Sequence, residues 1–324
     1  MRKKKAGKQA CILVFILLNI IPVQAQDNDE NVFRTSTELV LQVSSLPEAK
    51  LALNQRFIFP FLNGSGPLVK DNNLTALLSA EISPVSMNGI GELIWTPVAF
   101  FMLSGGGQAG SGWNIALGDG MGINAPEDET LPNDPPRKAK ISGDPLDGLV
   151  WRAWSAGTLQ FDLAAIVPGD WNHILFQTRH EFRYSGYTRA EPGDLWIYEA
   201  DEAENQNGWL YYANYVLGYY MPQSPVLDTI AFMAEINKSL YNSPGGDFWG
   251  ESLGRWIFSG LFNFSIHPKF STALIIQMRT RRNFGSRNIY TSDYYYKDLE
   301  LEGDNGQRRV LFYRAAVILT YKIH

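Results

Sequence analysis

The sequence predicts an all-β fold, an antiparallel β-barrel that crosses a membrane with its strands. Three observations lead to this prediction. They are an export signal at the N-terminus, segments in which apolar and polar residues alternate, and connections that are alternately short and long. Ten strands are favoured, and twelve are the alternative.

The first 25 residues have the layout of a secretory signal peptide. A strongly basic start is followed by an apolar run from Ala10 to Ile21 and by the small-residue ending Val23-Gln24-Ala25. This order predicts export and cleavage after Ala25, because the run is short for a membrane helix, which needs about 20 residues. The only cysteine, Cys11, lies in this segment. The exported chain is therefore expected to contain no disulfide and no thiolate.

Alternation with a period of two runs through much of the remaining chain. From Ile174 to Tyr184 one face carries apolar side chains such as Phe176 and Phe182, and the other carries Arg179 and Glu181. Successive side chains of a strand point to opposite faces, so such a segment is a strand with one apolar and one polar face. The last segment is predicted to place on its apolar face Leu311, Tyr313, Ala315, Val317, Leu319, Tyr321 and Ile323.

Short and long connections alternate when the chain is followed back from its C-terminal end. The links at 267–269, 221–228 and 168–172 are short, and those at 283–308, 242–254 and 188–207 are long. Membrane barrels have short periplasmic turns and longer extracellular loops. Continuing this order gives ten strands, with both termini of the barrel domain on the periplasmic side: Lys50–Phe61, Asn73–Ser83, Met87–Ser104, Leu149–Val167, His173–Tyr187, Trp209–Tyr220, Thr229–Tyr241, Arg255–Ile266, Phe270–Arg282 and Arg309–Lys322.

The twelve-strand alternative comes from the middle of the chain. The segment Leu149 to Val167 is long for one strand and contains the turn-like pair Ala156-Gly157, and Gly112 to Gly118 can pair separately. The segment Gly105 to Pro136, rich first in Gly and then in Pro and acidic residues, is predicted to be a large surface loop.

The domain prediction has three parts. They are a signal peptide at 1–25, a periplasmic N-terminal extension at 26–48 and a single barrel domain at 49–324. The extension ends in the alternating segment Thr37 to Val43, so a strap, an extra strand and a short plug all remain open for it.

With its export signal, alternating strands, order of connections and terminal segment Val317 to His324, the chain resembles the bacterial outer-membrane β-barrel superfamily. No motif selects a subfamily. The resemblance implies location in the outer membrane, with outer-membrane lipid and the barrel assembly machinery as partners. Members typically end on an aromatic residue that the insertion machinery reads, whereas this chain ends on His324 and its nearest aromatic residue is Tyr321.

Charge and motifs exclude several classes of function. Removing residues 1–25 takes away five of the 28 basic and none of the 33 acidic residues, so the net charge falls from -5 to -10, and nucleic acid is not an expected partner. Gly105 to Gly110 fits G-x-G-x-x-G, but no helical pattern follows it, as a dinucleotide site requires. The acidic residues Glu127, Asp128, Glu129 and Asp134 lack EF-hand spacing.

Neither a catalytic site nor a metal or cofactor site is predicted. The four histidines have no metal-ligand spacing. Asp162, Asp170 and His173 are close in sequence, but the last two fall in a predicted turn. The candidate functional residues are instead charged side chains expected to face the lumen: Glu81, Glu92, Arg179, Glu181, Arg183, Glu235, Arg279, Arg281, Arg314 and Lys322.

These charges either pair with one another, as buried charges must, or form a constriction that selects solutes. For any single residue, pairing is the favoured interpretation. The first functional hypothesis is porin-like passage of ions or small solutes. The alternatives are a surface barrel whose long loops bind an extracellular ligand, and an outer-membrane hydrolase, the enzyme hypothesis being the least favoured. At the level of fold, a secreted β-sandwich is the alternative.

Overall fold

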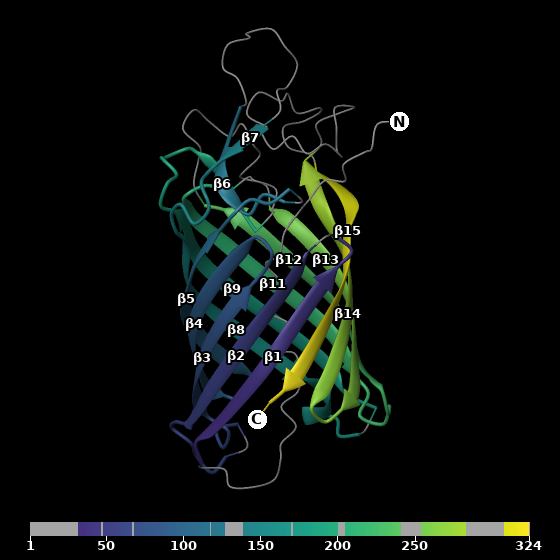
Figure 1. Ribbon diagram of the computed structural model, residues 1–324. Coiled ribbons are helices and arrows are strands. Elements are labelled where there is room, and N and C mark those ends of the chain that lie inside the picture. Colours follow the sequence, from purple (N-terminus) through teal and green to yellow (C-terminus); the bar gives the residue numbers. More distant parts are fainter. Residues whose placement is uncertain are drawn as a thin grey trace.

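The chain forms an antiparallel barrel (Figure 1). The computed structural model describes residues 32–46, 48–66, 68–116, 118–126, 139–169, 171–199, 205–240, 254–282 and 308–323. The barrel strands are β1 (Arg34–Ser44), β2 (Ala49–Pro60), β3 (Asn73–Ile82), β4 (Ser86–Val98), β5 (Phe101–Gly112), β8 (Val150–Asp162), β9 (Ile174–Tyr187), β11 (Gly208–Tyr220), β12 (Leu227–Ser239), β13 (Arg255–His267), β14 (Phe270–Arg282) and β15 (Arg308–Lys322).

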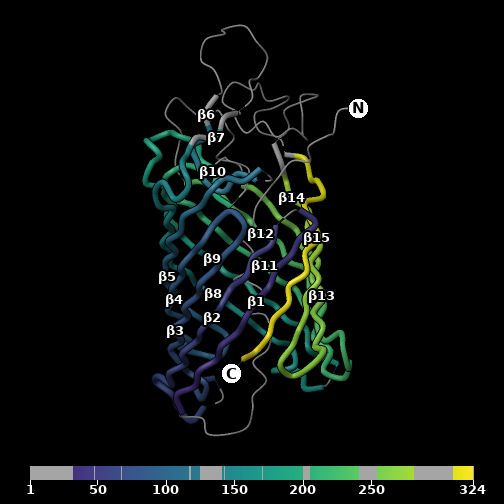
Figure 2. Tube along the Cα trace, in the orientation of Figure 1, coloured from purple at the N-terminus to yellow at the C-terminus, as the bar shows by residue number. Residues whose placement is uncertain are grey.

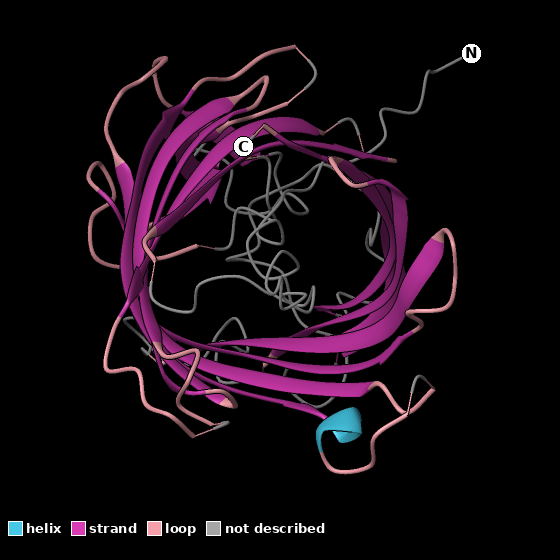
Figure 3. Cartoon of the chain, turned by 90° about the horizontal axis from the view of Figure 1, so that it is seen from below, coloured by secondary structure: helices cyan, strands magenta, loops and turns pink. Residues whose placement is uncertain are grey.

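The end-on view shows the strands arranged in a ring (Figure 3), which is closed by the pairing of the first and last strands. The order around the wall is β1-β15-β14-β13-β12-β11-β9-β8-β5-β4-β3-β2. In β1, Leu41 pairs with Leu319 of β15 on one side and with Leu51 of β2 on the other. Residues 34–44 are therefore part of the wall, which is the extra strand among the three alternatives left open for the segment 26–48. Residues 1–31, with the predicted signal peptide, lie outside the described residues.

The Gly-rich segment after Leu103 is a strand and not the start of a surface loop. The predicted strand Met87–Ser104 is in fact a hairpin of β4 and β5, which turns at Ala99 and Phe100. Glycine inside a strand often marks a close approach of another group. At Gly106, an added Cβ would lie 2.6 Å from both the Trp154 ring and the Gly91 carbonyl oxygen.

The barrel thus has twelve strands, the alternative, and not the favoured ten. The two further strands are β1 and β5. They do not arise from a turn at Ala156-Gly157, since β8 runs through that pair without a break. Gly112 ends β5, and beyond it Ile115 and Gly118 form an isolated bridge.

The two ends of the barrel differ in their connections. The end where β1 begins and β15 finishes carries the links 61–72, 99–100, 163–173, 221–226 and 268–269. We call it the short-turn end. The opposite, long-loop end carries 113–149, 188–207, 240–254 and 283–307, but also the short links 45–48 and 83–85. The alternation of short and long connections therefore holds in the second half of the chain and fails in the first.

The outward face of the wall is apolar. Leu93, Leu217 and Phe232 point outward and are more than half exposed, as expected for side chains that face lipid. A bulge between Gln277 and Met278 shifts β15, so that Phe312 faces outward and Tyr313 is buried inside. The prediction that Tyr313 belongs to the apolar outward face is wrong for this reason.

Aromatic side chains gather near both ends of the barrel. At the long-loop end, Tyr184 packs between Trp151 and Trp209, with ring centroids 5.1 and 5.5 Å apart. At the short-turn end, the Tyr219 hydroxyl donates to the carbonyl of Trp171. Such rings prefer the headgroup level of a bilayer. No helix among the described residues is long and apolar enough to cross a membrane.

A second, smaller sheet lies at the long-loop end (Figure 2). It consists of β6 (Met121–Pro126) and β7 (Ala139–Ser142) from the β5–β8 connection and of β10 (Leu195–Tyr198) from the β9–β11 connection, in the order β10-β6-β7. All four residues of β10 are buried. This sheet joins two long connections into one ordered unit.

Candidate functional site

The inward face of the barrel is the candidate functional site. It has a charged part on β2–β5, β8 and β9 and a mixed part, apolar and polar, on β1 and β11–β15. The apolar side chains form a buried cluster, here called the inner apolar cluster, made of Val40, Ala52, Val216, Ala231, Met233, Leu261, Ile275 and Ile318.

A ladder of alternating charges follows the inward face of β9 and reaches β4. The Arg179 guanidinium contacts Glu92 at 3.0 Å and Glu181 at 2.8 Å, and Arg183 contacts the other oxygen of Glu181 at 2.6 Å. The Trp154 indole also donates to Glu92. All four charged side chains are at most 14 % exposed. We call Glu92, Arg179, Glu181 and Arg183 the charge ladder, in which each carboxylate has a guanidinium partner.

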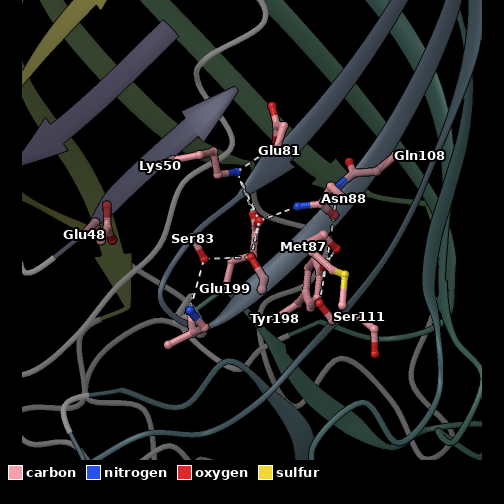
Figure 4. Close-up of polar contacts among 12 residues, drawn as sticks. Glu48, Lys50, Glu81, Ser83, Met87, Asn88, Gln108, Ser111, Tyr198 and Glu199 are labelled. Carbon is pink, nitrogen blue, oxygen red and sulfur yellow. Dashed lines mark hydrogen bonds and ion pairs between the residues drawn. The ribbon is translucent and has the colours of Figure 1, made fainter. Parts of the chain in front are cut away.

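A second charged group lies at the long-loop end, around Glu199, which directly follows β10 (Figure 4). The Glu199 carboxylate accepts hydrogen bonds from Lys50 of β2 at 3.0 Å and from Ser86 and Asn88 of β4 at 2.9 and 2.6 Å. Lys50 also donates to Glu81 of β3 at 3.0 Å. We call these residues, together with Tyr198, the Glu199 cluster.

Tyr198 completes this cluster. Its hydroxyl lies 2.7 Å from Oδ1 of Asn88, and the guanidinium of Arg152 lies 5.9 Å from its ring centroid. Burial raises the pKa of Tyr198. Burial alone would also raise the pKa of Glu199, but Lys50 and Arg152 together with the hydrogen bonds it accepts hold that pKa below its ordinary value. Glu199 is therefore an anion and Tyr198 a neutral phenol at neutral pH.

Two further polar groups lie on β11–β15. The Tyr212 hydroxyl donates to Glu235 at 2.7 Å. The guanidinium groups of Arg279 and Arg314 lie 4.3 and 4.8 Å from the ring centroid of Tyr313, within the range of cation–π attraction. The bulge that turns Tyr313 inward thus builds a mixed arginine–tyrosine group on the lumen wall.

Most of the sequence candidates come together in these groups. Glu92, Arg179, Glu181 and Arg183 form the charge ladder, Glu81 joins the Glu199 cluster, and Glu235, Arg279 and Arg314 belong to the groups on β11–β15. Lys322 lies apart, exposed at the last position of β15, and Arg281 is placed only as the partner of Arg309 in the strand register.

The sequence analysis missed Glu199, Lys50, Arg152 and Tyr198. Strand alternation contained a signal for Lys50 and Arg152, since both occupy inward positions of predicted strands. Glu199 and Tyr198 lie within a predicted loop, where no periodicity indicates which side chain returns to the wall.

The acid–imidazole pair near the short-turn end does form. Nδ1 of His173 lies 2.7 Å from Oδ2 of Asp162, and the other oxygen of Asp162 accepts from the amide of Ala164. The pair therefore joins the end of β8 to the start of β9. Asp170 and the acidic segment Glu127–Asp134 lie outside the described residues. Gly105–Gly110 lies within β5, so the helix that a dinucleotide site needs does not follow it.

Comparisons with known proteins return only structural likenesses. No family model and no curated protein matches the sequence. The KdgM porin has a TM-score of 0.39 at 10% identity, over 89% of this chain and 99% of that one. The β domain of the Bordetella autotransporter BrkA has 0.38 at 10%, over 90% and 99%. OmpT, an outer membrane protein of Vibrio cholerae, has 0.33 at 6%, over 92% and 99%.

The twelve paired strands close, and their outward side chains are apolar. The architecture is that of an outer-membrane β-barrel, and the aromatic side chains near both ends are consistent with a place in that membrane.

Proposed function

We propose that this protein forms a channel through which small hydrophilic solutes cross the outer membrane. The observation that carries the proposal is the contrast between the two faces of one closed wall. Outward side chains are apolar, whereas the inward face of β2–β5, β8 and β9 carries the charge ladder and the Glu199 cluster. Water and polar solutes favour such an inner surface.

The size of the barrel supports the same proposal. With strand spacings of about 4.8 Å and a tilt of about 40°, twelve strands make a barrel roughly 24 Å across between opposite backbones. Side chains that extend about 6 Å from each wall would leave a bore of at most roughly 12 Å. The bore is narrower beside the inner apolar cluster, where Met233 and Ile275 are only 1 % exposed.

The pairing of the charges predicts weak discrimination between ions. In the ladder two arginines face two glutamates, and in the Glu199 cluster Lys50 and the nearby Arg152 face Glu81 and Glu199. Because opposite charges lie side by side, their fields largely cancel at the distance of a passing solute. We expect a channel with little preference between small cations and small anions.

Conductance across a planar bilayer tests the proposal. The purified exported chain should insert in steps of uniform conductance, and a reversal potential near zero in a salt gradient should report the weak ion preference. A protein that inserts, shows heat-modifiable migration on gels and yet conducts no ions would contradict the proposed passage.

Neighbouring residues of β12 offer a matched test of the route. Asn237 pairs with Tyr212, whose side chain is buried inside the barrel, and Ile236 is the adjacent outward position. A charged thiol reagent should lower the conductance of Asn237→Cys and leave that of Ile236→Cys unchanged. Equal responses of both variants, or of neither, would contradict conduction through the lumen.

A further inference from the structure

The connection between β9 and β11 is anchored at its base by Asn207. The Asn207 side chain accepts from the Tyr187 amide and the Trp196 indole and donates to the carbonyls of Tyr187 and Ala190. Trp196 is fully buried and also pairs with the backbone of Asn205. We call the described part of this connection, residues 188–199 and 205–207, the strap.

The tip of the strap, Tyr198 and Glu199, contacts strands that lie far around the wall from β9 and β11, the two strands that the strap connects. Around the barrel, β8 and β5 separate β9 from β4, and β3 and β2 come next. Tyr198 nevertheless contacts Asn88 of β4, and Glu199 contacts Lys50 of β2. Lys50 lies on the first inward position and Asn88 on the second at the long-loop end of their strands. The strap therefore lies inside the mouth, against the charged part of the wall.

Glu199 holds the tip in place. Its side chain is 6 % exposed, and its amide donates to the carbonyl of Gly120 at 2.7 Å. Its φ of 57° lies in the left-handed region, which a residue other than glycine occupies only when its surroundings determine it. The contacts that do so are this backbone hydrogen bond, the ion pair with Lys50 and the hydrogen bonds from Ser86 and Asn88.

We infer that the strap is a lid over one side of the mouth and that the Glu199–Lys50 ion pair is its latch. With the latch formed, β10 and the tip narrow the entrance. With the latch broken, the left-handed residue relaxes and the tip leaves the wall, so the entrance widens. The inference rests on the proposed channel only for its conductance readout.

The first test is the conductance of Glu199→Gln, which removes the charge and keeps the size of the side chain. A lid of about one strand's thickness, roughly 5 Å, covers close to half of a bore of roughly 12 Å, so its release should raise single-channel conductance about two-fold. The matched control is Glu191→Gln, because Glu191 is an exposed acidic residue of the same strap. Unchanged conductance in Glu199→Gln, or an equal rise in the control, would overturn the latch.

The accessibility of the strap can also be measured without conductance, by the rate at which an introduced thiol is labelled. Ile197 of β10 is fully buried, and the only cysteine of the sequence, Cys11, lies in the predicted signal peptide. The thiol introduced by Ile197→Cys should react slowly with a maleimide in the otherwise native chain and with the control substitution, and at least ten-fold faster when Glu199→Gln is added.

The two readouts separate the two proposals. Faster labelling in a barrel that never conducts would support the latch and contradict the channel. A conducting barrel in which neither labelling nor conductance responds to Glu199→Gln would overturn the latch and leave the channel standing. Heat-modifiable migration of each variant checks that the barrel has folded.

Discussion

The two parts of the lumen wall are stabilised in different ways. On β2–β5, β8 and β9, inward side chains form ion pairs between strands, as Arg179 does with Glu92. On β11–β15 and β1, many inward side chains are aliphatic, as Ile275 and Ile318 are in the inner apolar cluster. One half of the interior therefore combines an apolar cluster with a few polar groups, such as Arg314 with Gln277, and the other depends on complete pairing of charges. Solute contacts and moving parts are expected in the charged half.

The largest effect should come from breaking the charge ladder. Arg179→Met leaves Glu92 without this cation and Glu181 with Arg183 alone. Removing one partner of a buried pair typically costs about 3–5 kcal/mol. We expect the free energy of unfolding in detergent, measured by urea titration, to fall by an amount near that range. Arg189→Met is the control, since Arg189 pairs with Asp147 at the surface, and it should cause no measurable change.

A slightly smaller loss is expected in the apolar half. Ile275→Ala empties a site inside the cluster, where truncation of a large aliphatic side chain costs about 2–5 kcal/mol. Ile276, the next residue, faces outward, and lipid can refill the space that Ile276→Ala leaves. The difference between the two urea titrations should report the cost of the cavity. Equal losses would show that the inner apolar cluster is not packed as a core.

Substitution of Glu235 tests whether a buried carboxylate must be charged for the barrel to keep its stability. One of its oxygens accepts from Tyr212, and the other has no hydrogen-bond partner in the described part of the chain. Glu235→Gln keeps an acceptor for Tyr212, so we expect a change in unfolding free energy within about 1 kcal/mol. Glu181→Gln, which weakens contacts to two arginines, should cost clearly more. A large loss for Glu235→Gln would place this carboxylate in an ion pair.

The smallest expected effect is the pH dependence of the single-channel conductance. The pKa of Glu199 is lowered in the folded protein, so the latch is intact above the ordinary glutamate pKa of about 4.3 and is lost as pH falls through the lower, folded value. Single-channel conductance should be constant between about pH 5 and pH 8 and should rise only in stronger acid. Glu199→Gln should show no such acid transition.

Much of the fold could be predicted because alternation is a local signal. The barrel strands from β8 to β15 follow the predicted segments, with β9 at Ile174–Tyr187 against a predicted His173–Tyr187. The pairing of β1 with β15 joins residues that are far apart in the sequence, such as Leu39 and Tyr321, and no local pattern contains it. β5 was missed because glycine disfavours strands unless another group needs the space, and Trp154 supplies that need.

The candidate site could be predicted only in part, for a similar reason. Arg179 and Glu181 follow from their places in one strand, but their pairing with Glu92 depends on the order of strands around the wall. Glu199 depends on the path of a long connection, which the packing of Trp196 and Asn207 determines. Sequence periodicity identifies which side chains face inward, and tertiary contacts decide which of them meet.

The closure of β1 on β15 has a consequence for biogenesis. Until the last strand reaches the first, the sheet has two open edges whose amide and carbonyl groups pair readily with any other strand. Contacts this distant in sequence also form slowly. A barrel that lacks β15 would keep both edges open and would remain a substrate for aggregation or proteolysis.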